Sequence, residues 1–130
     1  MRARSCRYLA LSALVMSCSG EYTGPVSGTL DVRLSSPNSD DGAALFTVAG
    51  GAIEAADALG GTVFTAKIDG NTTRVVVAGR VTSGVIARLH ITDMRQAGQY
   101  TIVLNQVAVR STYTAREPAG YSISLSPASQ

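Results

Sequence analysis

The sequence over residues 63–78 reads VFTAKIDGNTTRVVVA. Two runs rich in β-forming residues flank the polar residues 69–71, and Asp-Gly is a strong hairpin signal because glycine accepts a positive φ. The run 75–77 is three valines with nothing polar between them. Strands with one wet face alternate, so this run predicts a strand covered on both faces at the centre of a sandwich. We expect Val75 and Val77 to face the opposite sheet, and Val76 to pack under a loop or under the segment 52–59.

Outward from this hairpin, apolar and polar residues alternate with period two, which is the pattern of half-buried strands. The apolar sets are Leu30, Val32 and Leu34; Ala44 to Val48; Val85, Ala87, Leu89 and Ile91; Tyr100, Ile102 and Leu104, then Val107 and Val109; and Tyr121, Ile123 and Leu125. The set that begins at Tyr100 changes parity near Asn105 and Gln106, which predicts a bulge or a bend there.

About seven or eight short strands in about 100 residues predict an all-β fold, a single antiparallel β-sandwich over residues 29–126. The segment order, with residues 43–48 early and 84–91 late, resembles cohesin-like domains and related carbohydrate-binding modules; an immunoglobulin-like sandwich is the other form we expect. This resemblance implies a domain that docks a protein or polysaccharide ligand, and it carries over no binding residue. The segment 52–59 is helical or a strand, and the resemblance favours the strand.

The first 17 residues have the layout of a secretory signal peptide. Arg2, Arg4 and Arg7 precede an apolar stretch over residues 8–16 that only Ser12 interrupts. A membrane span needs about 20 apolar residues, so this stretch is too short to remain as one. The chain of 130 residues has 11 basic and 9 acidic residues. Without the three signal arginines the count is 8 against 9, so basicity gives no indication of nucleic-acid binding.

Residues 14–18 resemble the lipobox of bacterial lipoproteins, in which cleavage leaves a lipidated cysteine at the new N-terminus. Val15 and Ser17 occupy the aliphatic and small positions, whereas Met16 is a less usual residue in the middle. The resemblance implies that Cys18 is lipidated and that a membrane is the first partner, because two or three acyl chains anchor durably where one does not. The alternative is ordinary signal cleavage with Cys18 incidental.

The resulting domain organisation is a signal peptide (1–17), a lipidated cysteine with a flexible linker (18–28), the sandwich (29–126) and a short tail (127–130). The linker is rich in glycine and small polar residues. We expect a lipid-anchored protein of the cell envelope, on the outer membrane where the cell has one because Ser19 and not aspartate follows Cys18. Otherwise the protein is secreted or periplasmic.

The polar loop 37–42 offers oxygen ligands for Ca²⁺ in Asn38, Asp40 and Asp41. An EF-hand does not fit, because with Gly42 at the sixth loop position the first and twelfth would be Pro37 and Val48. A looser calcium site and a solvated turn remain the two interpretations.

No catalytic motif and no cofactor motif stands out. His90 is the single histidine, it alternates outward on its strand, and no Gly-x-Ser-x-Gly elbow accompanies it. Among the aromatic residues, Tyr113 on a predicted loop is the one free candidate for stacking on a sugar. We therefore expect a non-enzymatic envelope lipoprotein with an interaction or structural module. The alternative is a cohesin-like or carbohydrate-binding module that docks an envelope protein or polysaccharide by one sheet face.

Overall fold

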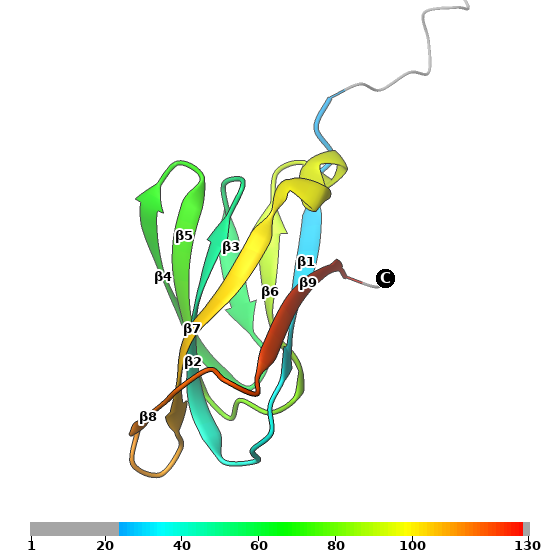
Figure 1. Cartoon of the computed structure of the whole chain (residues 1–130). Helices are drawn as coiled ribbons and strands as arrows, with labels where there is room; N and C mark the ends of the chain where they lie inside the picture. The colour runs from blue at the N-terminus through cyan, green and yellow to red at the C-terminus, as the bar shows by residue number, and fades with distance from the viewer. Residues whose placement is uncertain (1–23, 129–130) are drawn as a thin grey trace, which may run out of the picture.

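The computed structural model describes residues 24–128 and contains two antiparallel sheets packed as a β-sandwich (Figure 1). The strands are β1 (Gly28–Ser35), β2 (Asp41–Ala49), β3 (Ala55–Ala58), β4 (Gly61–Asp69), β5 (Thr72–Gly79), β6 (Gly84–Ile91), β7 (Thr101–Val109), β8 (Ala115–Arg116) and β9 (Ser122–Pro127), with a 3₁₀-helix η2 (Met94–Gln99) before β7. One sheet has the order β3-β6-β1-β9 and the other β4-β5-β2-β7-β8. The predicted all-β sandwich is confirmed, and its strands run one residue beyond each expected limit of the domain.

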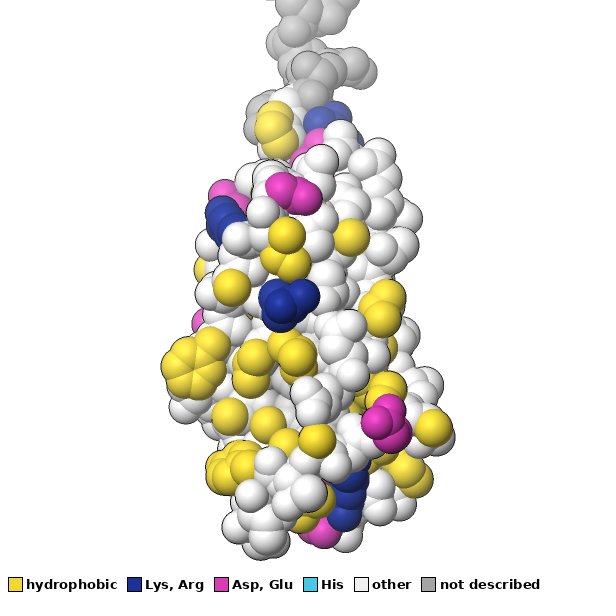
Figure 2. Space-filling view, turned by 60° about the vertical axis from the view of Figure 1, so that its left-hand side comes forward, with side chains coloured by type: hydrophobic (Ala, Val, Ile, Leu, Met, Phe, Trp, Pro, Cys, Tyr) yellow, Lys and Arg dark blue, Asp and Glu magenta, His cyan; other side chains and the backbone are white. Residues whose placement is uncertain are grey.

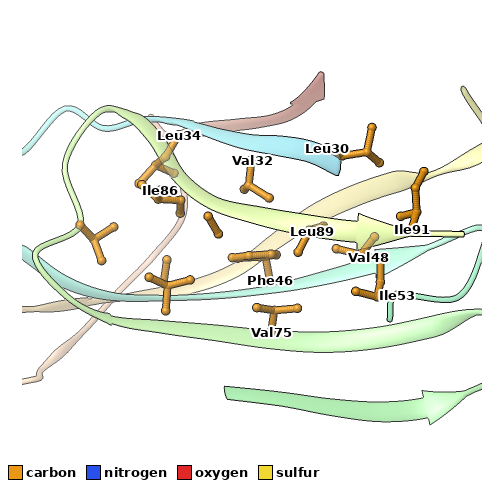
Figure 3. Close-up of a cluster of buried hydrophobic side chains, with 14 residues drawn as sticks. Leu30, Val32, Leu34, Phe46, Val48, Ile53, Val75, Ile86, Leu89 and Ile91 are labelled. Atoms are coloured by element: carbon orange, nitrogen blue, oxygen red, sulfur yellow. The ribbon is translucent and has the colours of Figure 1, made fainter. Parts of the chain in front are cut away.

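The core lies between the two sheets and consists of aliphatic side chains around one aromatic ring. Phe46 on β2 is fully buried, and it lies among side chains from both layers (Figure 3). The buried cluster is Leu30, Val32, Leu34, Ala44, Phe46, Val48, Ile53, Val75, Val77, Val81, Ile86, Ala87, Leu89 and Ile91. Tyr100 and Tyr121 pack against this cluster while partly buried, in agreement with their parity.

The hairpin that opened the sequence analysis joins β4 to β5, as predicted. Its turn is stabilised differently than expected, because Gly70 does not have a positive φ. The Asp69 carboxylate instead accepts a hydrogen bond from the Asn71 N–H at 2.8 Å. A positive φ occurs at Gly50, at 105°, where the chain leaves β2 and donates its N–H to the Asn71 carbonyl.

Four register shifts interrupt the pairing of the described strands, and two of them bear on the predicted parities. The predicted bulge on β7 is confirmed: Leu45 pairs with Gln106 and Phe46 with Leu104, so Asn105 is the extra residue. A second bulge on β6 was not predicted. Val32 pairs with Ala87 and Arg33 with Val85, which leaves Ile86 as the extra residue. Consequently Ile86 is buried, and the expectation that Val85 faces the core is wrong.

The expected position of Val76 is also wrong. β5 is flanked by β4 and β2 within its sheet, and Val75 and Val77 face the core as predicted. Val76 points to the opposite face and is only half-buried. The segment expected to cover it forms β3, a strand as we favoured, and pairs with β6 in the other sheet. An unbroken apolar run therefore marks here a strand whose outer face is apolar and open.

Candidate functional site

The outer face of the five-stranded sheet is apolar across neighbouring strands. Val76 lies between Phe64 on β4 and Leu45 on β2, as its direct cross-strand partner on each side. The next row consists mainly of alanines: Thr62, Ala78, Ala43, Ala108 and Ala115. We call the outward residues Ala43, Leu45, Phe64, Val76, Ala78, Val103, Ala108, Tyr113 and Ala115 the apolar face.

Exposure on the apolar face is large for individual side chains. Phe64 is 61% exposed, Val103 58% and Tyr113 61%. Figure 2 shows hydrophobic side chains spread over one side of the molecule with few charged groups among them. A third row of cross-strand partners on this face consists of Ala66, Arg74, Thr47 and Val103. Across this row and the two rows described above, Arg74 is the single charged residue.

A shallow hollow of about 310 Å³ lies on this face at the end nearest β8. Alanines and valines line most of it, with Tyr113 and Gln106: the lining is Ala43, Ala44, Leu45, Val76, Gln106, Val107, Ala108, Tyr113 and Ala115. Tyr113 has a φ of 56°, a left-handed conformation that is uncommon for a residue other than glycine. Its N–H donates to the Val109 carbonyl at 2.7 Å, which fixes the loop that presents the ring.

The outer face of the other sheet is polar and charged. Asp57, Arg88 and Asp31 stand in one row across β3, β6 and β1. The Arg88 Nε donates to the Asp31 Oδ1 at 2.9 Å, and Asp31 is only 3% exposed although it points away from the core. Removal of Arg88 would leave that carboxylate buried without its partner. The outer face of the five-stranded sheet is therefore mainly apolar, whereas that of the four-stranded sheet carries charged residues.

His90 lies on this charged face, as its outward parity predicted. Its Nε2 is 2.7 Å from the Asp57 Oδ2, and both side chains are substantially exposed. Within residues 24–128 no serine hydroxyl is hydrogen-bonded to His90, and its direct cross-strand partner on β1 is Thr29. The histidine and acid form a surface pair.

The candidate calcium ligands come together around an arginine. The guanidinium of Arg116 on β8 donates to the Asp40 Oδ1 at 2.7 Å and to the Asp41 Oδ1 at 2.8 Å. Asp41 is fully buried and also accepts from the Tyr121 hydroxyl at 2.9 Å, while the Asn38 amide donates to that same hydroxyl oxygen at 2.9 Å. The carboxylate oxygens that would bind a cation are thus engaged by a fixed cation of the protein. Among the described residues no cluster of three or more metal-ligating side chains is found.

This cluster holds the loop before β2 against β8 and β9. The hydrogen bond from Arg116 lowers the pKa of Asp40 below its ordinary value, and the two carboxylates raise the pKa of Arg116. The charged forms of Asp40 and Arg116 therefore stabilise the folded arrangement. The cluster has the character of a structural ion pair that fastens the β1–β2 loop.

Cys18 and the signal peptide lie outside the described residues 24–128. Across that part of the chain, no helix has both the length and the apolar character needed to cross a bilayer. Comparison with protein-family models, with curated proteins and with solved structures found no match.

Sequence reasoning found one member of the apolar face, Tyr113, and missed the rest. The expectation that Val76 is covered fails because apolar composition alone does not separate a buried face from an exposed one. The signal in the sequence is Phe64. Across the hairpin Phe64 pairs with Val76, and a large aromatic residue beside an outward valine predicts an apolar outer row.

Proposed function

We propose that this chain is an exported envelope lipoprotein whose sandwich is a non-enzymatic interaction module, and that the module binds its partner through the apolar face. The observation that carries this proposal is the contrast between the two outer faces. A contiguous exposed apolar surface is uncommon on a monomer and marks an interaction site. The other sheet, with Asp57, Arg88 and His90 outward, shows the polar surface that water-facing strands normally have.

The chemistry of the face defines the kind of partner that fits it. Flat rows of alanine and valine favour a flat apolar counterpart, and the rings of Phe64 and Tyr113 project from the sheet as anchors. Arg74 gives the face one positive charge beside Thr47. A partner that presents an apolar surface with a carboxylate opposite Arg74 would satisfy all of these groups.

The test compares two lysine substitutions with equal charge. Leu45→Lys places a cation in the middle of the apolar face, and Ser124→Lys places one on the exposed outer face of the other sheet. Both variants should keep the strand-type circular dichroism spectrum. Partner recovery from the native envelope should fall at least tenfold for Leu45→Lys and remain unchanged for Ser124→Lys. Equal recovery of the partner by both variants would remove the apolar face from the interaction.

Membrane anchoring through Cys18 is the second part of the proposal, and its support is the lipobox-like stretch from Val15 to Cys18. Cys18→Ala removes the acceptor thiol without changing the domain. Cell fractionation should then move the protein from the membrane fraction to the soluble fraction. A protein that stays equally membrane-bound after this change is held there by something other than a lipid on Cys18.

A carbohydrate ligand is the alternative, and Tyr113 is the feature that favours it. Its ring is exposed at the edge of the 310 Å³ hollow, where a sugar ring could stack on it above the alanine floor. Tyr113→Ala should then abolish retention on envelope polysaccharide while Phe64→Ala leaves it intact. A protein partner that covers the whole face should instead lose affinity with both variants.

A further inference from the structure

The strand β4 is a long free edge of the five-stranded sheet. It has nine residues, it pairs only with β5, and every residue except Val63 is exposed. The other sheet edges are shorter: β3 has four residues, β8 has two, and β9 has six and ends in Pro127. A long unprotected edge is a template for pairing with another strand, and short length or proline is how proteins usually prevent this. The protection on β4 is limited to Lys67 and an irregularity in its pairing next to Asp69.

Exposed hydrophobic residues are concentrated at this edge. Phe64 is 61% exposed and Ile68 53%, and Leu59 just before the strand is 49% exposed. The side chains of Thr65 and Lys67 point to the inner side of the sheet, because their partners on β5 are the buried Val75 and Thr73. Both are nevertheless exposed. The edge of β4 thus lies beyond the cover of the opposite sheet.

We propose that two copies of this chain pair through β4 in an antiparallel, two-fold symmetric arrangement centred on Thr65. The backbone direction supports this centre. The Gly60 carbonyl accepts from the Arg80 N–H at 3.0 Å, in register with the pairs of β4 and β5. Backbone groups alternate in direction along a strand, so the odd residues Val63, Thr65 and Lys67 present their N–H and C=O groups to the free edge.

The sequence of β4 is self-complementary in this register. Thr65 is the middle of the nine-residue strand, so a two-fold axis there pairs its regular stretch from Val63 to Lys67, which ends before the bulge at Ile68. Phe64 lies opposite Ala66 of the second copy, so a large side chain meets a small one. Lys67 lies opposite Val63 of the second copy, and no two like charges face each other. An isologous contact of this kind closes after two copies.

Pairing at this edge has a consequence for the apolar face. The two five-stranded sheets become one continuous sheet, and their apolar faces lie on the same side of it. Each Phe64 has the other Phe64 as a diagonal neighbour across the axis, within reach of an aromatic side chain. The dimer therefore buries part of the exposed rings and doubles the docking surface. This inference does not rest on the proposed function and is tested without a partner.

Disulfide trapping tests the register. The full chain made free of native cysteines (Cys6→Ser, Cys18→Ser) receives one new cysteine. Directly opposed residues in an antiparallel hydrogen-bonded pair have Cα atoms about 5.5 Å apart, which a disulfide spans. Thr65→Cys should therefore form a linked dimer under mild oxidation. Ile68→Cys on the same exposed strand is the matched control, because its symmetry mate lies six positions away, about 20 Å.

Sedimentation of the same chain measures the association itself. The cysteine-free chain should sediment as a dimer at high concentration, and Thr65→Lys should shift the dissociation constant at least tenfold towards monomer by placing like charges at the axis. Thr65→Val keeps the strand and should leave the dimer intact. A monomer at every concentration, open-ended aggregates, a dimer indifferent to Thr65→Lys, or linkage as rapid at position 68 as at position 65 would each overturn the proposal.

Discussion

Two adjacent valines on β5 have opposite environments and should respond differently to the same substitution. Val75 is fully buried against Phe46 and the rest of the core, whereas Val76 lies half-exposed on the outer face. Val75→Ala removes two buried methyl groups and should cost about 1.5–3 kcal/mol including the cavity. Val76→Ala should cost less than about 1 kcal/mol, since part of that surface is already in water and β-propensity differences span only about 1 kcal/mol.

Substitution by aspartate should enlarge the difference in unfolding free energy between positions 75 and 76. At position 75 the carboxylate would be buried without a partner, a penalty of several kcal/mol that consumes most of the roughly 5–15 kcal/mol by which a domain is stable. At position 76 the carboxylate reaches water, and Arg74 lies two residues away on the same face. Val75→Asp should fail to fold, and Val76→Asp should fold with a loss of about 1–2 kcal/mol.

Urea unfolding followed by far-ultraviolet circular dichroism measures these differences, because the chain contains no tryptophan for fluorescence. With a urea slope of about 1–1.5 kcal/mol per M, Val76→Asp should lower the midpoint by about 1 M. Equal losses for the two alanine variants, or a Val76→Asp variant that does not fold, would mean that Val76 is covered, and would refute the open outer face.

Three further predictions concern the ion pairs and the domain. Asp41→Asn removes the charge that Arg116 binds in the interior and should cost about 1.5–3 kcal/mol in urea unfolding, with a clearly smaller loss for the exposed Asp40→Asn. Hydrogen bonds from Arg95 lower the pKa of Asp93 to about 2 from an ordinary 3.8. The folded state therefore binds the Asp93 proton more weakly than the unfolded state does. The stability contributed by the ionised carboxylate is complete above about pH 4 and is lost as the pH falls towards 2. The melting temperature of Asp93→Asn should consequently depend less on pH in that window than that of the unchanged protein. Residues 24–128 alone should give a strand-type spectrum whose melting temperature is unchanged by a chelator; a sharp drop would indicate a metal that holds the fold.

The sequence was sufficient for features that depend on local alternation. The strand of Leu30, Val32 and Leu34, the hairpin at residues 69–71 and the bulge at Asn105 each leave a direct trace in the order of apolar residues. The strand β8 leaves none, since two residues are too few to show a period. The bulge at Ile86 was hidden because the residues on either side of it, Val85 and Ala87, are themselves apolar.

The candidate site was less predictable because its contacts join distant parts of the chain. Arg116 binds Asp41 across 75 positions, and His90 meets Asp57 across 33. Nothing in a single sequence marks such pairs. The composition of the acidic loop at residues 38–41 is compatible both with carboxylates that bind Ca²⁺ and with carboxylates that bind an arginine. The arginine contact itself depends on topology, because the pairing of β7 with β8 brings Arg116 to the loop.

The outward position of Val76 also bears on why the apolar face exists. Threonine is close to valine in shape and is equally suited to strands, so a threonine at this position would keep β5 and remove apolar surface. The same face carries threonine at positions 47 and 62. Valine at 76, leucine at 45 and phenylalanine at 64 therefore are not required by the backbone, and their exposed surface adds little to folding stability because it is not removed from water. Their free-energy contribution becomes available only when something covers them, which is the physical reason behind the binding role proposed for this face.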